Sequence, residues 1–401
     1  MPKESSRMWF LEFECMGLYG KKVFFELVNL YFRQSLPRVR LALLKSLLCV
    51  SLVYSYLCPT IKEKHKMKIL VTGASGFIGS FLVDEALSRG CEVWAGVRGS
   101  SSRAFLQDAR IKFINLDFGN RERLDAQLAA FAAENGRWDY IIHAAGVTKC
   151  LNSDDFMRVN FDGTKNFIEA LAQCTMLPER FLYLSSLSIF GPVREEQPYN
   201  PILDTDTPCP NTAYGKSKLA AEEFIKSFPG LQYVIFRPTG VYGPREKDYF
   251  KMVQSIAAHV DFSVGYKPQV ITFIYVKDLV KAIYMAIDKG VAGRSYFVSE
   301  PRGYDSRSFS DYIQAELGVR RVLRIKAPLW VLKAISVCAE AIARVTKKAS
   351  TLNSDKYNIM KQRNWQCDTT PIEKELGFTI DYPLQQGTKE MIEWYKQEKW
   401  I

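Results

Sequence analysis

The stretch "KILVTGASGFIGS", from Lys68 to Ser80, decides the fold that this sequence predicts. A short apolar run leads into a turn with glycines at positions 73, 76 and 79, and a segment with helical spacing, "GSFLVDEALSRG", follows. Glycine permits a tight turn and leaves room for a pyrophosphate against the backbone, and the start of a helix offers unpaired N–H groups and a partial positive charge. Such a glycine pattern is weak on its own, but between a strand and a helix it strongly indicates a dinucleotide site.

Strands and helices continue to alternate beyond this turn. The apolar runs "CEVWAGVR", "IKFINLDF" and "WDYIIHAAG" are typical of strands, and "RERLDAQLAAFAAENG" is typical of a helix. Helices of this length between strands imply a parallel sheet. We therefore predict an α/β fold, a Rossmann doubly wound parallel sheet with helices on both faces, and a smaller C-terminal substrate lobe. Residues 67–240 are expected to form mainly the cofactor-binding domain and 241–401 mainly the substrate-binding lobe, with 270–290 returning to the Rossmann sheet.

The composition excludes several classes of protein. The chain has 401 residues, of which 47% are hydrophobic and 24% charged, as in a globular protein with a sizeable core. The net charge of +11 is spread along the chain, which suits phosphate-bearing ligands or an anionic membrane surface, and no nucleic-acid motif accompanies it. Nine cysteines without a CxxC pair and three histidines predict no metal site, and they are typical of reduced thiols in a cytoplasmic protein.

Residues 1–66 differ from the rest of the chain. They contain the apolar run "LALLKSLLCVSLVYSYLC" at 41–58, about 18 residues long, which is near the lower limit for a membrane span and is interrupted by Lys45. Because Met67 directly precedes the first strand, the favoured interpretation is that the extension is not part of the native protein. A membrane anchor, which would make the protein membrane-associated, and an ordinary helical extension are the alternatives, so association with a membrane is not favoured.

The end of the second strand bears on the choice of cofactor. The position about 20 residues after the glycine turn, where an acidic residue would hold a ribose 2′-hydroxyl, lies in "GVRGSSSR". Arg98, with Ser100 and Arg103 nearby, could instead neutralise a 2′-phosphate, which predicts NADP, with NAD as the alternative. Asp117, at the end of the third strand, could accept a hydrogen bond from the adenine amino group. Both residues could also be ordinary solvated loop residues.

A tyrosine and a lysine carry the catalytic prediction. In "AYGKSK", Tyr214 and Lys218 are four residues apart and share one face of a helix. Tyrosine, with a pKa near 10, is a poor base, but a lysine ammonium and a positive nicotinamide ring would stabilise the phenolate and lower that pKa. Tyr214 could then exchange a proton with a substrate hydroxyl as a hydride moves, and Lys218 would also hold the nicotinamide ribose. Ser186, from the strand "FLYLSSLSIFG", would hydrogen-bond the same substrate oxygen.

These motifs, in this order, resemble the extended short-chain dehydrogenases/reductases, the NAD-dependent epimerase/dehydratase superfamily. Further matches are "HAAG" at 143–146, "VNFDGT", "FRPTGVYGP" and "FIYVKDLVKAI", and the resemblance covers residue 67 to the C-terminus. It implies a catalytic triad of Ser186, Tyr214 and Lys218, with Ser186 preferred to Ser185 because it lies five residues before Gly191. The cofactor-contact positions that the resemblance implies are Gly73, Gly76, Phe77, Ile78, Gly79, Arg98, Asp117, Ala144, Ala145, Asn160, Tyr214, Lys218 and Pro238.

The branch of the superfamily is judged partly from what the sequence lacks. Sugar-nucleotide 4,6-dehydratases resemble one another in an acidic pair directly after the catalytic serine or threonine, where this chain has Leu187 and Ser188. Nucleotide-sugar epimerases typically place an arginine just before the "VxDL" segment to clamp a diphosphate, where this chain has Ile271 and Thr272. Dehydratase chemistry is therefore disfavoured. The epimerase interpretation is weakened but kept, because Arg245 could supply the clamp.

Other segments resemble reductases of lipophilic compounds. The stretch from the first strand to "GVRGSSS" is similar to dihydroflavonol reductases, and "TLNSDKYNIMKQRNWQCDTTPIEKELGF" to 3β-hydroxysteroid dehydrogenase-like members. The helix expected at 327–348 could line an apolar cleft, pack on the core or lie at a membrane surface. We predict an NAD(P)-dependent oxidoreductase that transfers a hydride between nicotinamide and a secondary alcohol or ketone of a lipophilic, steroid- or dihydroflavonol-like molecule. The alternatives are a nucleotide-sugar epimerase that uses the same triad and a non-catalytic NADP-binding regulatory protein; relatives suggest a homodimer.

Overall fold

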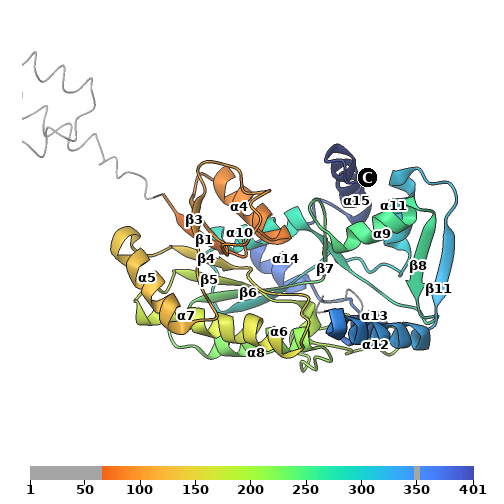
Figure 1. Cartoon of the computed structure of the whole chain (residues 1–401), viewed down its shortest axis with the longest axis horizontal. Coiled ribbons are helices and arrows are strands. Elements are labelled where there is room, and N and C mark those ends of the chain that lie inside the picture. Colours follow the sequence, from red (N-terminus) through yellow and green to blue (C-terminus); the bar gives the residue numbers. More distant parts are fainter. Residues whose placement is uncertain (1–65, 347–352) are drawn as a thin grey trace, which may run out of the picture. The chain divides into compact units, whose positions relative to one another are not determined.

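The computed structural model describes residues 66–346 and 353–401 (Figure 1). The apolar run at 41–58 lies outside the described residues, and the three interpretations of the N-terminal extension therefore stay predictions. Within the described ranges, no helix combines the length and the apolar character that a membrane crossing requires.

A seven-stranded sheet forms the centre of the described chain. Its strands are ordered β10-β6-β5-β4-β1-β2-β3, and every neighbouring pair is parallel. The strands are β1 (Lys68–Thr72), β2 (Glu92–Gly96), β3 (Lys112–Ile114), β4 (Tyr140–His143), β5 (Arg180–Leu184), β6 (Tyr233–Pro238) and β10 (Arg294–Val298). This order, with the chain moving outward from β1 in both directions, confirms the predicted doubly wound Rossmann sheet.

Helices cover both faces of the sheet, because successive side chains of each strand point to opposite sides. In β1, Ile69 and Val71 pack into one apolar cluster and Leu70 into the other. The helices of the first cluster are α4 (Phe77–Ser88), α10 (Val276–Asp288) and α14 (Thr370–Leu376). The helices of the second are α5 (Arg121–Asn135), α7 (Gly163–Gln173) and α8 (Ala213–Ser227). Burial on both faces explains why these strands are nearly continuous apolar runs.

A smaller lobe lies beside the carboxyl ends of the large sheet, at the right of Figure 1. Its helices are α9 (Asp248–Ala257), α11 (Ser308–Leu317), α12 (Leu329–Thr346), α13 (Ser354–Lys361) and α15 (Leu384–Gln397). Two parallel strand pairs accompany them: β7 (Gly240–Tyr242) with β9 (Phe273–Tyr275), and β8 (Val260–Val264) with β11 (Leu323–Ala327). The lobe has its own apolar core, which includes Tyr242, Phe309 and Met391.

The segment 270–290 links the lobe to the large sheet. Its strand, β9, pairs with β7 and not with the large sheet, whereas its helix, α10, packs against α4 in the core of the large sheet. The next strand, β10, then joins the edge of that sheet beside β6. The domain boundaries expected from the sequence stay a prediction.

Candidate active site

The turn between β1 and α4 has no room for side chains. Gly73 has a φ of +67°, a conformation that L-residues rarely adopt, and a Cβ at this position would lie 2.7 Å from the carbonyl oxygen of Ala144. A Cβ at Gly79 would overlap the carbonyl oxygen of Gly73. The glycines therefore let the turn sit directly against the end of β4, as their spacing predicts.

The start of α4 leaves hydrogen-bond donors available for an anion. Its N-cap is Gly76, and no side chain of the described chain caps the helix. The first hydrogen bond of the helix runs from the Ser80 N–H to the Gly76 carbonyl, so the N–H groups of Phe77 and Ile78 precede the helix ladder. These donors, the positive end of the helix dipole and the glycine cradle fit the pyrophosphate of a dinucleotide.

A buried histidine fixes the end of β4 beside this turn. The two ring nitrogens of His143 hydrogen-bond the hydroxyls of Thr72 and Thr164, at 2.9 and 3.0 Å. Burial lowers the pKa of His143 to about 3, and the positive charge of Lys218 adds to the shift, so the ring is neutral at physiological pH. The Ala145 N–H also donates to the Thr72 hydroxyl, at 3.2 Å. His143 thus orients the Thr72 hydroxyl, which in turn holds Ala145 of "HAAG" in place.

Asn160 holds the loop after β4 against the tyrosine helix. It lies on a π-helical turn, Met157–Asp162, a geometry that is frequent at functional sites. Its amide nitrogen donates to the Val147 carbonyl at 3.1 Å and to the Ser217 hydroxyl at 3.0 Å, and its oxygen accepts from the Val147 N–H at 2.8 Å. Both amide hydrogens are therefore used within the chain. The expected contact of Asn160 with the cofactor stays a prediction. Its hydrogen bonds show that it positions the loop at Val147 against the helix that carries Ser217.

The serine strand and the tyrosine helix meet at the carboxyl end of β5. The Ser186 and Ser188 hydroxyls are 2.9 Å apart, and Ser186 lies close enough to the Tyr214 hydroxyl to influence its pKa. Ser185 is buried, and its hydroxyl has no partner among the described residues. The structure therefore brings Ser186, and not Ser185, to Tyr214. Burial raises the pKa of Tyr214 to about 12, and the nearby hydroxyl of Ser186 opposes this shift.

Lys218 lies one helical turn from Tyr214 and is almost fully buried. Its ammonium donates to the carbonyl oxygen of Leu184 at 2.8 Å and lies 4.7 Å from the centre of the Tyr183 ring. Burial lowers the pKa of Lys218 to about 8, and the carboxylate of Glu222 partly offsets this. Without a cofactor, burial of the phenol dominates the pKa of Tyr214, and the expected lowering of that pKa by Lys218 together with a bound nicotinamide ring stays a prediction.

The N-terminus of α8 is held by α13, which comes about 140 residues later in the chain. The carboxylate of Asp355 accepts from the N–H groups of Ala213 and Tyr214, at 3.0 and 3.2 Å. Asn358 of the same helix donates to the Asn211 carbonyl at 3.0 Å. A carboxylate is favourable at a helix N-terminus, so α13 fixes the position of the first turn of α8, which carries Tyr214.

A buried ion pair fixes α8 to the sheet one turn further on. Arg237 of β6 binds the Glu222 carboxylate through two nitrogens, Nε at 3.0 Å and Nη2 at 2.7 Å, and both side chains are buried. Its guanidinium also lies over the rings of Phe190 and Phe297. A paired, buried guanidinium of this kind is costly to unpair, which makes the position of α8 well defined.

The other predicted cofactor residues lie at strand ends along the carboxyl edge of the large sheet. Arg98 follows β2 and is exposed; its N–H donates to the Ser101 hydroxyl at 3.1 Å, and its guanidinium has no ion pair with a described residue. Asp117 follows β3 and pairs with Arg123 at 3.2 Å on the surface. Pro238 is the last residue of β6. These positions agree with a cofactor laid across the sheet edge, and the individual contacts stay predictions.

Residues that would mark sugar-nucleotide chemistry are engaged elsewhere or replaced. Leu187, directly after Ser186, is buried and apolar, and the Thr272 hydroxyl donates to the Trp365 carbonyl at 2.5 Å. Arg245 donates to the Ser80 hydroxyl and to the Asp84 carboxylate, both at 2.9 Å, and its guanidinium lies 4.3 Å from the centre of the Phe81 ring. Arg245 is therefore bound to α4, which disfavours its use as a diphosphate clamp.

Comparisons with known proteins give one family and several activities. The model of the NAD dependent epimerase/dehydratase family matches residues 69–299. The chain is 24% identical over 369 residues to a dTDP-glucose 4,6-dehydratase of Neisseria gonorrhoeae, covering 84% of this chain and 98% of that protein. It is 24% identical over 335 residues to a ceramide reductase of Caulobacter vibrioides, covering 83% of this chain and 96% of that protein. It is 27% identical over 256 residues to a 3-beta-hydroxysteroid dehydrogenase of Mycolicibacterium neoaurum, covering 58% of this chain and 65% of that protein. The fold is similar to that of Thermus thermophilus UDP-glucose 4-epimerase in complex with NAD, with a TM-score of 0.64, 20% identity, and 82% and 99% of the two chains covered.

Proposed function

The chain belongs to the NAD dependent epimerase/dehydratase family and is an NAD(P)-dependent enzyme of the extended short-chain class, and from this premise we propose its reaction and substrate class. We propose that it transfers a hydride between NADP and a secondary alcohol or ketone of a lipophilic small molecule, steroid- or dihydroflavonol-like in character. The catalytic residues in this proposal are Ser186, Tyr214 and Lys218.

The observation that carries the proposal is the proximity of Tyr214 to Ser186, with no acidic residue at the two positions that follow Ser186. Burial raises the pKa of Tyr214 to about 12, so the hydroxyl is protonated at neutral pH and suited to donate a proton to a substrate carbonyl oxygen. Ser186 can donate a hydrogen bond to the same oxygen and stabilise the charge that develops there. The bound dinucleotide supplies the hydride.

Lys218 connects proton transfer to cofactor binding. Its ammonium is held at the Leu184 carbonyl, at the carboxyl end of β5, and one turn of α8 separates it from Tyr214. This position suits a hydrogen bond to the hydroxyls of the nicotinamide ribose. The positive charge would also favour the phenolate that Tyr214 becomes after donating its proton.

The substrate class is inferred from the groups around the triad. Elimination of water from a sugar needs an acidic and a basic side chain of the enzyme beside the substrate. The two positions after Ser186, where dehydratases have such groups, are Leu187 and Ser188. A nucleotide-sugar substrate carries a diphosphate, and the arginine position is occupied by Thr272 while Arg245 is bound to α4. The similarity to a ceramide reductase and to a 3-beta-hydroxysteroid dehydrogenase supports a lipophilic alcohol or ketone.

A nucleotide-sugar epimerase is the second candidate. It would use the same three residues to oxidise a sugar hydroxyl transiently and return the hydride to the other face. The similarity in fold to UDP-glucose 4-epimerase and in sequence to dTDP-glucose 4,6-dehydratases favours this candidate.

The preference for NADP rests on Arg98. The guanidinium of Arg98 is exposed beyond β2, at the sheet edge where the adenosine ribose of a Rossmann-bound dinucleotide lies, and it has no ion pair among the described residues. An arginine at this place can bind a 2′-phosphate, and two serines with hydroxyl groups, Ser100 and Ser101, follow it closely in the sequence.

A binding titration tests the cofactor. NADPH and NADH are titrated against the wild type, Arg98→Ala and the control Arg110→Ala, whose guanidinium pairs with Asp108 on the surface. We expect NADPH to bind more tightly than NADH, and Arg98→Ala to weaken NADPH at least about tenfold, as expected for the loss of a charged hydrogen bond, while NADH is unchanged. Tighter NADH binding, or a cofactor that copurifies and does not exchange, would favour the epimerase.

A substrate panel tests the reaction. It contains a ceramide, a 3β-hydroxysteroid and a flavan-3,4-diol with NADP+, the corresponding ketones with NADPH (for the diol, a dihydroflavonol), and UDP-glucose without added cofactor. Net oxidation or reduction of one lipophilic pair supports the proposal. Interconversion of UDP-glucose and UDP-galactose, with no turnover of the lipophilic pairs, would refute it.

A further inference from the structure

The β8–β11 sheet of the smaller lobe has its polar side turned inward. In a parallel pair, residues in register share a face, and the register here joins Asp261 to Arg324 and Phe262 to Ile325. One face therefore carries Asp261, Ser263, Arg324 and Lys326. The other face, called here the β8–β11 apolar face, consists of Val260, Phe262, Val264, Leu323, Ile325 and Ala327.

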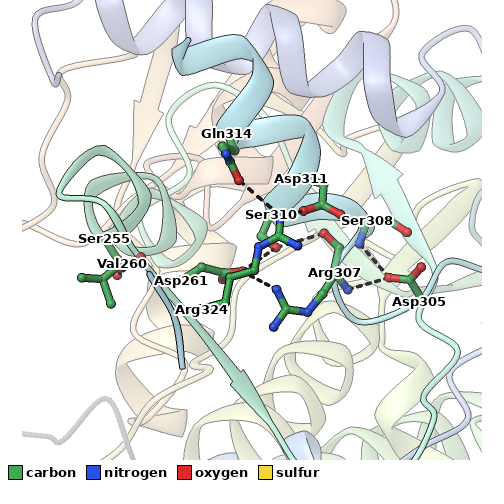
Figure 2. Close-up of polar contacts among 10 residues, drawn as sticks. All are labelled: Ser255, Val260, Asp261, Asp305, Arg307, Ser308, Ser310, Asp311, Gln314 and Arg324. Atoms are coloured by element: carbon green, nitrogen blue, oxygen red, sulfur yellow. Dashed lines mark hydrogen bonds and ion pairs between the residues drawn. The ribbon is translucent and has the colours of Figure 1, made fainter. Parts of the chain in front are cut away.

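The charged face contacts α11, as Figure 2 shows. The buried carboxylate of Asp261 accepts from the Ser310 hydroxyl at 3.1 Å and lies 3.5 Å from a nitrogen of Arg307. The guanidinium of Arg324 binds Asp311 at 2.5 Å and Gln314 at 3.3 Å. These bonds fix which way the sheet faces, because turning it over would bury the apolar face against α11 and unpair Asp261 and Arg324.

The β8–β11 apolar face is consequently left uncovered among the described residues. Phe262 is 61% exposed and Leu323 is 64% exposed. Two large aromatic residues follow the strands: Tyr266, 66% exposed, comes just after β8, and Trp330, 73% exposed, comes just after β11. The Tyr266 hydroxyl donates to the Lys326 carbonyl, which holds that ring beside β11. An exposed group of this size and kind marks an interaction surface.

The segment of the chain that contains β11 carries charges of one sign. Between Glu316 and Glu340 the chain has five basic residues and no acidic one. Arg324 is used in the ion pair with Asp311, and Lys326, on the same face as Arg324, lies over the Tyr266 ring; the other three, Arg320, Arg321 and Lys333, are exposed. An apolar surface with tryptophan and tyrosine at its border and basic residues around it matches the interface of a bilayer with an anionic surface.

We propose that the β8–β11 apolar face docks this enzyme onto a bilayer that contains anionic lipids. Phe262 and Leu323 enter the boundary between headgroups and acyl chains, Tyr266 and Trp330 lie at the headgroup level, and the basic residues contact the lipid phosphates. A second copy of the chain is a poorer occupant, because a two-fold interface would place Arg320, Arg321 and Lys333 against the same charges of the partner. This inference stands independently of the proposed substrate.

Vesicle sedimentation tests the proposal on the full chain. The probes are vesicles of phosphatidylcholine alone and of phosphatidylcholine with phosphatidylglycerol. We expect the protein to bind the anionic vesicles, and this binding to weaken with added salt. The affinity for these vesicles should fall at least about tenfold in Phe262→Ser/Leu323→Ser. It should fall by roughly fivefold for each charge removed in Arg320→Gln/Arg321→Gln. Leu151→Ser/Ile401→Ser, which removes two other exposed apolar side chains, is the matched control and should bind as the wild type does.

Amide hydrogen exchange locates the contact and distinguishes a membrane from the other possible partners of this face, the chain itself and a second copy. Docking predicts slower exchange at 260–266 and 319–335 only when anionic vesicles are present. The proposal is overturned if the anionic vesicles do not bind, or if the Phe262→Ser/Leu323→Ser variant binds them as well as the wild type. It is also overturned if vesicles protect residues 41–58 and leave 260–266 and 319–335 unchanged. Protection of these two segments without vesicles, or a dimer in light scattering that the same variant dissociates, would assign the face to the chain itself or to a second copy.

Discussion

The large sheet and the β8–β11 pair, both parallel, distribute polarity in opposite ways. The seven-stranded sheet buries apolar side chains on both faces and carries its polar and charged groups at the carboxyl ends of the strands. The β8–β11 pair turns its charged side chains toward α11 and its apolar side chains outward. The strands of the large sheet are nearly continuous apolar runs, whereas β8 and β11 alternate polar and apolar residues. The alternation shows that the two faces of the β8–β11 pair differ, and the contacts of each face determine which one is turned inward.

The largest expected effect concerns the polar edge of the large sheet. Replacement of Tyr214 by Phe removes the proton donor and keeps the ring, which packs edge-on against Phe156. Turnover of the best lipophilic pair in the panel should fall by roughly 10²–10⁴-fold, the usual contribution of a general acid. NADPH affinity and thermal stability should stay as in the wild type, and Tyr199→Phe, at a partly exposed tyrosine whose hydroxyl donates to the Pro268 carbonyl, is the control. Turnover close to the wild-type rate would remove Tyr214 from the mechanism.

The next effect compares the same residue type in the two sheets. Phe236 in β6 is 1% exposed, whereas Phe262 in β8 is 61% exposed. Phe236→Ala should lower the free energy of unfolding by about 3–5 kcal/mol, because it opens a cavity in the core. Phe262→Ala should change it by no more than about 0.5 kcal/mol, as is usual for a surface position. Urea denaturation measures both. A cost above about 2 kcal/mol for Phe262→Ala would mean that its face is covered within the chain.

A pH effect is expected from the buried lysine. Burial lowers the pKa of Lys218 to about 8, so the free enzyme loses this positive charge as the pH rises above about 8. Binding of an anionic dinucleotide favours the charged form, and binding above this pH therefore takes up a proton. The dissociation constant of NADPH should be constant below pH 8 and rise by up to about tenfold per pH unit above it. Lys218→Met should bind weakly with no such rise, and a wild-type profile that stays flat to pH 9.5 would contradict the assignment.

The smallest effect concerns the contact between the lobe and the tyrosine helix. Asp355→Ala leaves the N–H groups of Ala213 and Tyr214 without their carboxylate and should cost about 1 kcal/mol of stability. Asp355→Asn keeps one acceptor and should cost less. Chemical denaturation measures the free energy of unfolding of each variant. The kcat at saturating substrate should fall more than the loss of folded protein explains, because Tyr214 moves with the first turn of α8. Equal stability of both variants with the wild type would show that α13 does not hold this helix.

The glycine turn and the placing of Tyr214 and Lys218 on one helix could be predicted because each depends on neighbours in the sequence. Gly73 and Gly79 are required by the turn in which they lie, and Tyr214 and Lys218 share a helical face whatever surrounds them. The alternation of apolar strands with helices is likewise a local pattern, and it was sufficient for the large sheet.

Other features depend on contacts between distant segments. Asp355 lies about 140 residues beyond the helix that it caps, and nothing in "NSDKYN" indicates that partner. The pairing of Glu222 with Arg237 was missed for the same reason, although a charged residue inside the apolar run "YVIFRP" is a signal that it has a buried partner. In "VDFSV" the alternation is plain, but only the bonds of Asp261 to α11 show which face is turned inward.

The most direct test of the proposed function is the fate of the transferred hydride. NADPH carrying deuterium at C4 of the nicotinamide is incubated with the panel ketones, and the products are analysed by mass spectrometry. A net reductase predicts one deuterium on the carbinol carbon of a lipophilic product, formed by the wild type and greatly reduced in Tyr214→Phe. Absence of label in every lipophilic product, together with interconversion of UDP-glucose and UDP-galactose in which the hydride returns to the sugar, would contradict the account and make the enzyme an epimerase.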